Sequence, residues 1–291
     1  MEINWLKTFA VAARYENFRQ TAEDLFLTQP AITKHIRRLE EHLNTELFYR
    51  HGKSVTLTPA GHRFLPYAQA IIAKYDESFA DFAAWKQGYN RKLIITSAPQ
   101  IASSILPPLL RNFIAENRDI EVMINIQQSY DIGQEISAGR ADIGLSRLEP
   151  LQKNIHSEMI HEESVILVGP TKNENEEVLS EKTALTRYRL ITHNHPDYWD
   201  ELLGEILRVY PMIRTMAVKG VDISKKFIEA GLGVSFLPLT VVEEEILRGK
   251  LVEIPYTSIS TPKSSTYVVT KVQTEETKAF ISFLKEVMPK L

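Results

Sequence analysis

Cysteine is absent from this 291-residue chain. Its absence excludes disulfides, thiolate nucleophiles and cysteine-ligated metal sites. Long apolar runs are also missing, and none approaches the roughly 18 residues that suggest a membrane span. The opening segment MEINWLKTFAVAARYENF lacks a basic leader followed by an apolar block and a small-residue cleavage site. We therefore expect cytoplasmic residence and no membrane partner.

The motifs of common enzyme classes are missing as well. We find no Gly-rich phosphate loop, no Gly-x-Ser-x-Gly elbow and no His-Glu-x-x-His pair. The GLGV segment at 231–234 lies between a predicted helix and a predicted strand, the wrong order for a dinucleotide-binding fingerprint. These absences argue against an enzyme and against a bound cofactor. An enzyme fused to another module remains an alternative that a turnover assay would reveal.

The composition is that of an ordinary soluble protein, with 44% hydrophobic and 24% charged residues, and the length suits two or three domains. The net charge of −3 hides an asymmetry. Segments 28–38 and 50–75 contain only basic residues among their charged ones, if His is counted as neutral. Basic charge gathered on one module of a near-neutral chain favours a sequence-specific nucleic-acid binder, although short basic runs can also be solvated faces.

Segment 18–61 predicts a helix over 19–26, a tight turn, and a second helix that Thr28 caps and that ends near Leu43. Short strands over 46–50 and 55–58 form a wing. Apolar residues of the second helix recur at three- and four-residue spacing, which leaves a polar face free for DNA. The apolar positions are Ile32, Ile36, Leu39 and Leu43.

Residues 58–87 predict one long helix, with Thr58 as its cap and Pro59 in its first turn. Large apolar residues recur along it with nearly heptad spacing and need a partner surface. We favour pairing of two subunits through this helix; docking on its own domain is the alternative. The apolar positions are Phe64, Ala68, Ile71, Tyr75, Phe79 and Phe82.

After a hinge at 88–92, predicted strands and helices alternate, which indicates an α/β domain with a mostly parallel sheet. We expect a winged helix-turn-helix domain over 1–58, a linker and dimerisation helix over 59–88, and an α/β domain over 89–291. The last domain should have two lobes, one formed by about 89–162 and 264–291 and the other by about 163–263.

These features make the sequence similar to a known protein family. Residues 1–88 resemble the DNA-binding domain and linker helix of LysR-type transcriptional regulators, and AGRADIGL (138–145) and EAGLGVSFLP (229–238) resemble two segments of their effector domains. Asn44 and Pro59 depart from the usual residues. The first match rests on Phe18, Ala22, Leu25, Gln29, Pro30, Ala31, Thr33, Ile36, Leu39, Glu40, Leu47, Phe48, Arg50, Leu57, Thr58, Ala60 and Gly61.

The resemblance implies an all-α-rich winged helix-turn-helix domain with a long linker helix, joined to a two-lobed α/β effector domain like periplasmic binding proteins. It implies that the protein binds double-stranded DNA at an inverted-repeat operator, binds a small-molecule effector, and forms a homodimer or homotetramer. Segments 192–203 and 231–239 are similar to a subgroup that represses a citrate synthase gene. A repressor of that or another central-carbon gene is therefore expected. An activator of a different operon is the alternative, and a solute-binding protein is less favoured.

Ten residues are candidates for DNA contact. Gln29 can pair with an adenine edge, and Pro30 and Ala31 can meet a thymine methyl. Arg19 and Thr28 suit phosphates. The remaining candidates are Thr33, Lys34 and Arg37 on the same helix and Arg50 and Lys53 in the wing.

Ligands of open α/β sheets bind beyond the carboxyl ends of strands, which places the candidate effector site at several predicted strand ends. Ser97 and Ser103 lie near a predicted helix N-terminus, and Arg147, His193 and His195 could supply positive charge, so a small carboxylate is the favoured ligand. Each His could instead be structural. His193, His195 and Asp197 could also be read as metal ligands, but Pro196 interrupts them and we expect no metal. The other candidates are Pro99, Gln100, Ser129, Ser146, Asn194 and Val221.

Overall fold

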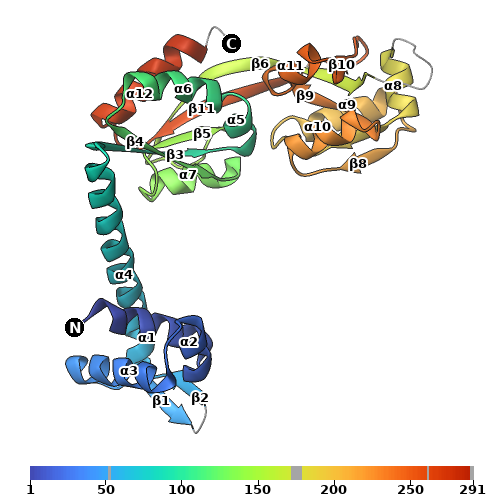
Figure 1. Cartoon of the computed structure of the whole chain (residues 1–291). Coiled ribbons are helices and arrows are strands. Elements are labelled where there is room, and N and C mark those ends of the chain that lie inside the picture. Colours follow the sequence, from blue (N-terminus) through green and yellow to red (C-terminus); the bar gives the residue numbers. More distant parts are fainter. Residues whose placement is uncertain (52–53, 172–178, 261, 289–291) are drawn as a thin grey trace. The chain divides into compact units, whose positions relative to one another are not determined.

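The computed structural model describes residues 1–51, 54–171, 179–260 and 262–288 (Figure 1). The chain divides into two compact units, Met1–Gly88 and Tyr89–Leu291. Each unit is built around its own buried apolar residues. Within the described residues, no helix combines the length and the apolarity that crossing a membrane requires.

The first unit is mainly helical, with one two-stranded antiparallel hairpin. Helix α2 ends at Asp24, two residues before the predicted end, and the other helices lie where they were expected. In chain order the elements are α1 (Ile3–Tyr15), α2 (Phe18–Asp24), α3 (Gln29–Leu43), β1 (Phe48–His51), β2 (Ser54–Leu57) and α4 (Pro59–Lys86).

Side-chain caps define where these helices begin. The Asn17 side chain accepts hydrogen bonds from the first turn of α2, and Thr28 and Thr58 do the same for α3 and α4. Asn44 ends α3 in the left-handed conformation at a φ of 49°, as the sequence predicts. The turn and wing are thereby set by local polar side chains.

Aromatic rings hold the core of the first unit together. Phe48 of the wing packs edge-on against Phe9 of α1 and Phe18 of α2. At the start of α4, Gly61 lies so close to the wing that an added Cβ would be 2.2 Å from the Leu47 carbonyl oxygen. The wing therefore packs directly on the backbone of α4.

Helix α4 has 28 residues, which at 1.5 Å per residue gives a length of about 42 Å. Pro66 lies inside it without ending it. The predicted apolar stripe is buried at Ala68 but exposed farther along, and both Phe79 and Phe82 are about 60% exposed. The second half of α4 thus presents aromatic side chains to solvent.

In the part that the structure describes, the second unit has eight strands on one connected path, a further strand, β10, that pairs with β6 beside that path, and helices that cover the sheet. Its elements are β3 (Arg91–Ser97), α5 (Pro99–Ser103), α6 (Leu106–Glu116), β4 (Ile120–Ile126), α7 (Ser129–Ser137), β5 (Ile143–Ser146), β6 (His156–Pro170), α8 (Glu181–Arg187), β7 (Arg189–Thr192), α9 (Trp199–Val209), β8 (Thr215–Ala217), α10 (Val221–Glu229), β9 (Gly233–Pro238), α11 (Leu239–Leu247), β10 (Leu251–Glu253), β11 (Lys263–Thr270) and α12 (Glu275–Val287).

The sheet is mixed, which corrects the expectation of a mostly parallel one. Pairing is parallel between β3 and its neighbours β4 and β5, and between β7 and its neighbours β8 and β9. Strands β6 and β11 pair antiparallel with each other, and they join the two parallel groups through β9 and β5. Parallel order therefore holds inside each lobe and is lost where the chain crosses between them.

Helices cover both faces of each lobe. In the first lobe, α6 and α12 lie on one face of the sheet and α7 on the other (Figure 1). The second lobe has two separate apolar clusters, one that includes α9 and one that includes α10 and α11. This layering leaves the crossing region of β6 and β11 as the place where the two lobes share polar contacts.

Several short elements differ from the sequence expectation. Helices α5 and α8 and strand β10 were not predicted, because each is too short to show a periodic pattern. Arg91 and Lys92 belong to β3 rather than to a hinge, since β4 pairs with them from Ile120 onward.

Candidate functional site

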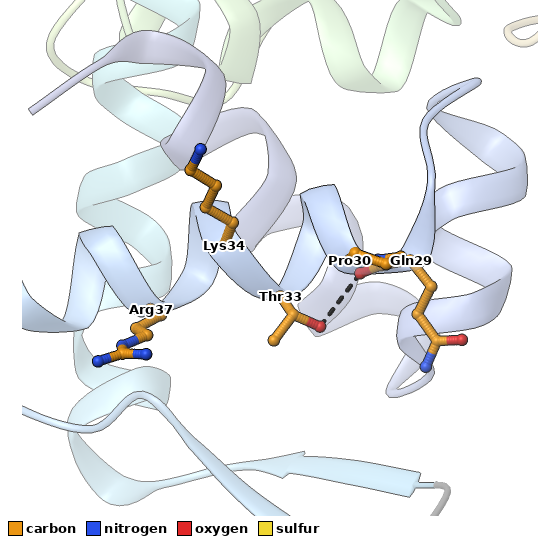
Figure 2. A pocket seen from close by; sticks show the side chains of 5 residues that line it. All are labelled: Gln29, Pro30, Thr33, Lys34 and Arg37. Carbon is orange, nitrogen blue, oxygen red and sulfur yellow. Dashed lines mark hydrogen bonds between the residues drawn. The ribbon is translucent and has the colours of Figure 1, made fainter.

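Five residues of α3 line a shallow hollow on the surface of the first unit, and we call them the reading face: Gln29, Pro30, Thr33, Lys34 and Arg37. The face exists because Ile32, Ile36 and Leu39 are fully buried on the other side of the helix. Figure 2 shows Gln29 and Arg37 extending from the helix in one direction and Lys34 in another. The Thr33 hydroxyl donates to the Gln29 carbonyl oxygen at 3.1 Å. Amide, hydroxyl and cationic groups are thus displayed together in solvent.

The three arginines that are candidates for DNA contact each form an ion pair with a carboxylate. Arg37 donates to Glu41 at 2.8 Å, one helical turn away, and both side chains are more than half exposed. Arg19 and Arg50 make longer ion pairs, at 3.2 and 3.4 Å. Exposed pairs contribute little stability, so Arg19 and Arg37 can exchange a carboxylate for another anion at small cost. The partner of Arg50, Glu40, is only 11% exposed and also accepts from two backbone N–H groups.

A second groove adjoins the reading face and brings Arg19 and Arg50 to it. It is lined by Asn17, Phe18, Arg19, Gln29, Thr33, Arg50 and Val55. Sequence reasoning missed Asn17 and Val55; the hydrogen-bonding Asn directly before α2 was the signal for the first. Thr28 serves as the α3 cap and Ala31 is half-buried. Lys53 lies outside the described residues.

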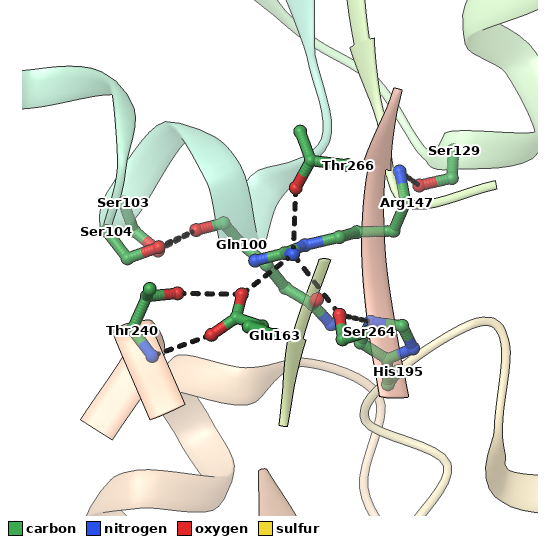
Figure 3. A network of polar contacts seen from close by, with 10 residues as sticks. All are labelled: Gln100, Ser103, Ser104, Ser129, Arg147, Glu163, His195, Thr240, Ser264 and Thr266. Carbon is green, nitrogen blue, oxygen red and sulfur yellow. Dashed lines mark hydrogen bonds and ion pairs between the residues drawn. The ribbon is translucent and has the colours of Figure 1, made fainter. Parts of the chain in front are cut away.

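In the second unit, a network of polar side chains occupies the crossing of β6 and β11, which we call the lobe junction. It consists of Arg147, Glu163, His195, Thr240, Ser264 and Thr266 (Figure 3). Arg147 follows β5 in the first lobe, and Thr240 begins α11 in the second. Glu163 on β6 accepts hydrogen bonds from both lobes.

Arg147 is completely buried, so its positive charge lies inside the protein and not on the solvent-exposed surface. Its Nη1 donates to Glu163 at 3.0 Å and also contacts the Ser264 and Thr266 hydroxyls. Burial lowers the pKa of the guanidinium, and the neighbouring Glu163 carboxylate opposes that shift. Within the described part of the chain, Nε and Nη2 have no hydrogen-bond acceptor. Glu163 therefore balances the charge of the guanidinium at Nη1, while the Nε and Nη2 donors are left without acceptors among the described residues.

His195 is also buried, and its environment makes it neutral. Burial, and then the nearby Arg147 charge, lower its pKa well below 6.5. The Asp197 backbone N–H donates to Nδ1 at 3.2 Å, so Nε2 carries the proton and donates to Ser264 at 3.0 Å. The imidazole is stacked on the Tyr198 ring. His195 thus supplies hydrogen bonds, not the expected positive charge.

The other predicted ligand residues are only partly brought together. Gln100 Nε2 donates across the lobes to the Asn194 carbonyl oxygen at 2.6 Å. Asn194 itself is buried and holds Ser235 and Trp199 by side-chain hydrogen bonds. Ser129 accepts from the Arg147 backbone N–H at 3.2 Å. These residues therefore lie around the lobe junction.

Some predicted residues have local roles instead. Ser97 is buried and donates to the next carbonyl oxygen, and Ser146 donates to Leu148 two residues on. Ser103 is the last residue of α5 and is not at a helix N-terminus, a correction that follows from the helix starting at Pro99. Val221 is buried at the start of α10.

His193 does not join the junction. It is exposed, has a φ of 62°, and its Nδ1 lies 2.8 Å from the Thr192 hydroxyl. The described residues contain no group of three His, Cys, Asp or Glu side chains arranged to hold a metal ion. Both ring nitrogens of His195 already have protein partners. The metal-ligand interpretation of 193–197 thus gains no support.

A helix-turn-helix with a wing and an exposed polar recognition helix, in one chain with a two-lobed α/β unit, defines a DNA-binding transcription regulator with a sensing domain. Residues 3–62 match the family model for bacterial regulatory helix-turn-helix proteins of the lysR family, and residues 86–289 match the LysR substrate binding domain. The chain belongs to the LysR family of bacterial transcription regulators.

Similar proteins agree with this assignment. The HTH-type transcriptional regulator CitR of Bacillus subtilis is 40% identical over 286 residues, 98% of each chain. YxjO of the same organism, an uncharacterized HTH-type transcriptional regulator, is 37% identical over 99% of this chain and 98% of its own. The crystal structure of full-length CbnR complexed with its target DNA has the same fold, with a TM-score of 0.70 at 22% identity and coverage of 98% and 99%. The subgroup resemblance inferred from segments 192–203 and 231–239 is confirmed.

Proposed function

We propose that the chain represses a citrate synthase gene or another gene of central-carbon metabolism, in the cytoplasm, under control of a small carboxylate. The DNA-binding part of the proposal is supported by the reading face, which consists of four exposed residues and the half-buried Thr33 on a helix whose opposite side is buried. The target gene rests on the similarity to CitR. Activation of a different operon is the alternative. No catalytic role is proposed for any residue.

Each reading-face residue suits a different contact. Gln29 can donate to and accept from an adenine edge, and Pro30 with Ala31 can pack on a thymine methyl. Thr33, Lys34 and Arg37 line the same hollow farther along α3. Arg19, Thr28 and the wing residues Arg50 and Lys53 are proposed to contact phosphates, which position the helix without selecting a base.

Two copies of the chain would read an inverted repeat together. The second half of α4 supports this, because its exposed aromatic residues need a partner surface. The Tyr75 and Phe79 rings lie 4.7 Å apart in a tilted arrangement, and Phe82 stacks on Trp85 at 5.7 Å. Clusters of exposed rings on a monomer are typical of interaction surfaces. We propose a homodimer through α4, and a homotetramer as the full assembly.

The lobe junction is the proposed effector site. The support is the buried guanidinium of Arg147, whose Nε and Nη2 lack acceptors among the described residues. A carboxylate accepts two parallel hydrogen bonds from such a pair of donors. Gln100, Ser129 and His195 surround Arg147 with further polar groups. Binding there would change the contacts between lobes and shift the population of DNA-binding states.

The test is DNA binding by the full chain at fixed salt, with a citrate synthase promoter and random duplex DNA of equal length, with and without citrate and related carboxylates. We expect selective binding that one acid changes several-fold. Selective binding that no acid changes would contradict the carboxylate effector. Equal binding to both duplexes would contradict the proposed target.

A further inference from the structure

The turn between α2 and α3 holds an apolar ring in solvent. Phe26 is 95% exposed, and its φ of 53° lies in the left-handed region that non-glycine residues rarely adopt. Both features are unfavourable for a free-standing protein, because an aromatic ring is left in water on a strained backbone. Some other interaction must offset these two unfavourable contributions to the free energy.

Hydrogen bonds at the end of α2 require the left-handed conformation. The Leu27 N–H donates to the Ala22 carbonyl oxygen at 2.9 Å, and the Phe26 N–H donates to the Glu23 carbonyl oxygen at 3.3 Å. These two bonds form the Schellman motif, whose left-handed residue is usually Gly and sometimes Asn. Residue 26 is therefore a position where the backbone favours Gly or Asn.

Helix α3 ends with the same motif and the expected residue. The Thr45 N–H donates to Glu40 at 3.1 Å and the Asn44 N–H donates to Glu41 at 3.3 Å. The same pair of bonds also ends α7, α10 and α11, where the left-handed residues are Gly139, Gly231 and Gly249. Among the described residues, Phe26 is therefore the one residue at such a turn that is neither Asn nor Gly. The motif itself cannot explain this difference, so a role for the exposed ring is the remaining physical explanation.

Phe26 precedes the α3 cap by two residues and Gln29 by three. At the reach of an extended chain, its Cα lies within about 11 Å of the Gln29 Cα. One ring buries at most about 250 Å², far less than the roughly 800 Å² per partner of a protein–protein interface. The ring is therefore too small to form an interface alone, but it can enlarge an interface that neighbouring residues form. The reading face is the surface next to it.

We propose that Phe26 is a further DNA-contacting residue, and that its ring packs on apolar surface of the duplex beside the bases that Gln29 reads. The apolar surface is a thymine methyl or a deoxyribose ring. This inference rests on the proposed function of the reading face. It explains why the left-handed position keeps an aromatic residue in place of Gly or Asn.

The experiment uses the full chain and a duplex that it selects from a random pool, with affinity measured over a range of salt concentrations. Phe26→Asn keeps a residue that tolerates the backbone and removes the ring. We expect about tenfold weaker binding with an unchanged salt dependence, because no phosphate contact is lost. Phe26→Met, which keeps apolar surface, should stay within about threefold of the parent, given the adaptability of methionine.

Two controls separate contact from folding. Met212→Asn removes an equally exposed apolar side chain, 93% exposed, from the other unit and should leave DNA affinity unchanged. The melting temperature of Phe26→Asn should be no lower than that of the parent, since Asn suits a positive φ. A lower melting temperature for Phe26→Asn, or an equal affinity loss in Met212→Asn, would overturn the proposal.

Uracil in place of thymine, one position at a time, identifies the surface. If a thymine methyl is the partner, uracil at one position lowers the DNA affinity of the parent protein and does not change the DNA affinity of Phe26→Asn. If a deoxyribose is the partner, no position shows this difference and the tenfold loss persists. Both results support the contact.

Gln29→Ala distinguishes failure of this inference from failure of the proposed function. If Gln29→Ala loses selectivity while Phe26→Asn binds like the parent, the reading face stands and the Phe26 contact is wrong. If neither change affects selective binding, the proposed reading face itself is wrong. Normal DNA binding by Phe26→Asn with lost gene regulation would also overturn the contact and indicate a protein partner.

Discussion

Two arginine–carboxylate pairs in this chain have nearly the same length and opposite surroundings. Arg37 and Glu41 on α3 are 2.8 Å apart, with side chains 75% and 60% exposed. Arg147 and Glu163 at the lobe junction are 3.0 Å apart, with side chains 0% and 5% exposed. Water screens the first pair and not the second, so the distance alone says little about either. A partner in solvent can reach the first arginine, whereas the second is enclosed by the fold and can meet a ligand only inside the lobe junction.

The largest effect is expected from Glu163→Ala. The change leaves the Arg147 guanidinium buried without its carboxylate, which costs about 3–5 kcal/mol. It also removes the acceptor of the Thr240 N–H, which donates at 2.8 Å. Denaturant unfolding of the full chain would measure the loss. Glu162→Ala, an exposed neighbour paired with Lys263, is the control and should cost less than about 1 kcal/mol; equal losses would contradict the comparison.

Gln29→Ala tests the exposed side of the comparison. We expect a loss of about 1–3 kcal/mol of discrimination at one base pair, with little change in folding stability. Competition between operator variants and random duplex DNA would measure it. Gln20→Ala, on the exposed surface of α2, is the matched control. A uniform loss on every sequence would assign Gln29 to positioning rather than to reading.

Acid should weaken the lobe junction through His195. Its pKa is well below 6.5 in the folded chain, mainly because it is buried, so below pH 6.5 the unfolded chain binds a proton that the folded chain does not. Stability from this residue is complete above pH 6.5 and falls by up to about 1.4 kcal/mol per pH unit as the pH drops toward the folded pKa. His195→Gln should reduce the slope in unfolding experiments between pH 7 and 5. An unchanged slope would show that His195 is not the titrating group.

The smallest effect is expected from Glu41→Ala. Loss of an exposed pair one helical turn apart should change stability by only about 0.3–0.5 kcal/mol. It also frees Arg37 and removes a negative charge from α3, so DNA affinity should rise slightly at low salt and return to the parent value at high salt. A stability loss as large as that of Glu163→Ala would erase the distinction between the two pairs.

The same contrast explains what could be predicted from the sequence. The reading face follows from a local pattern, because Ile32, Ile36 and Leu39 recur at helical spacing and leave Gln29 and Arg37 outside. The caps at Thr28 and Asn44 are local as well. Such features need only a few neighbouring residues, and the helices they define lie where they were expected.

The lobe junction could not be predicted in this way. The partners of Arg147 are 16, 117 and 119 residues away in sequence, so its burial depends on tertiary packing. Glu163 was overlooked because a carboxylate before the apolar run of β6 resembles a surface residue. Ser103 was misplaced because α5 has no side-chain cap to announce its start at Pro99.

The close packing at Gly61 restricts which amino-acid substitutions this chain can accept. Any other side chain there would collide with the Leu47 carbonyl oxygen, which already accepts the Thr58 N–H at 2.9 Å, and the Leu47 amide is held by Glu40. Neither side of the contact can retreat without losing hydrogen bonds. In a library of random substitutions, functional survivors should accumulate changes at exposed positions such as Met212 and keep glycine at 61.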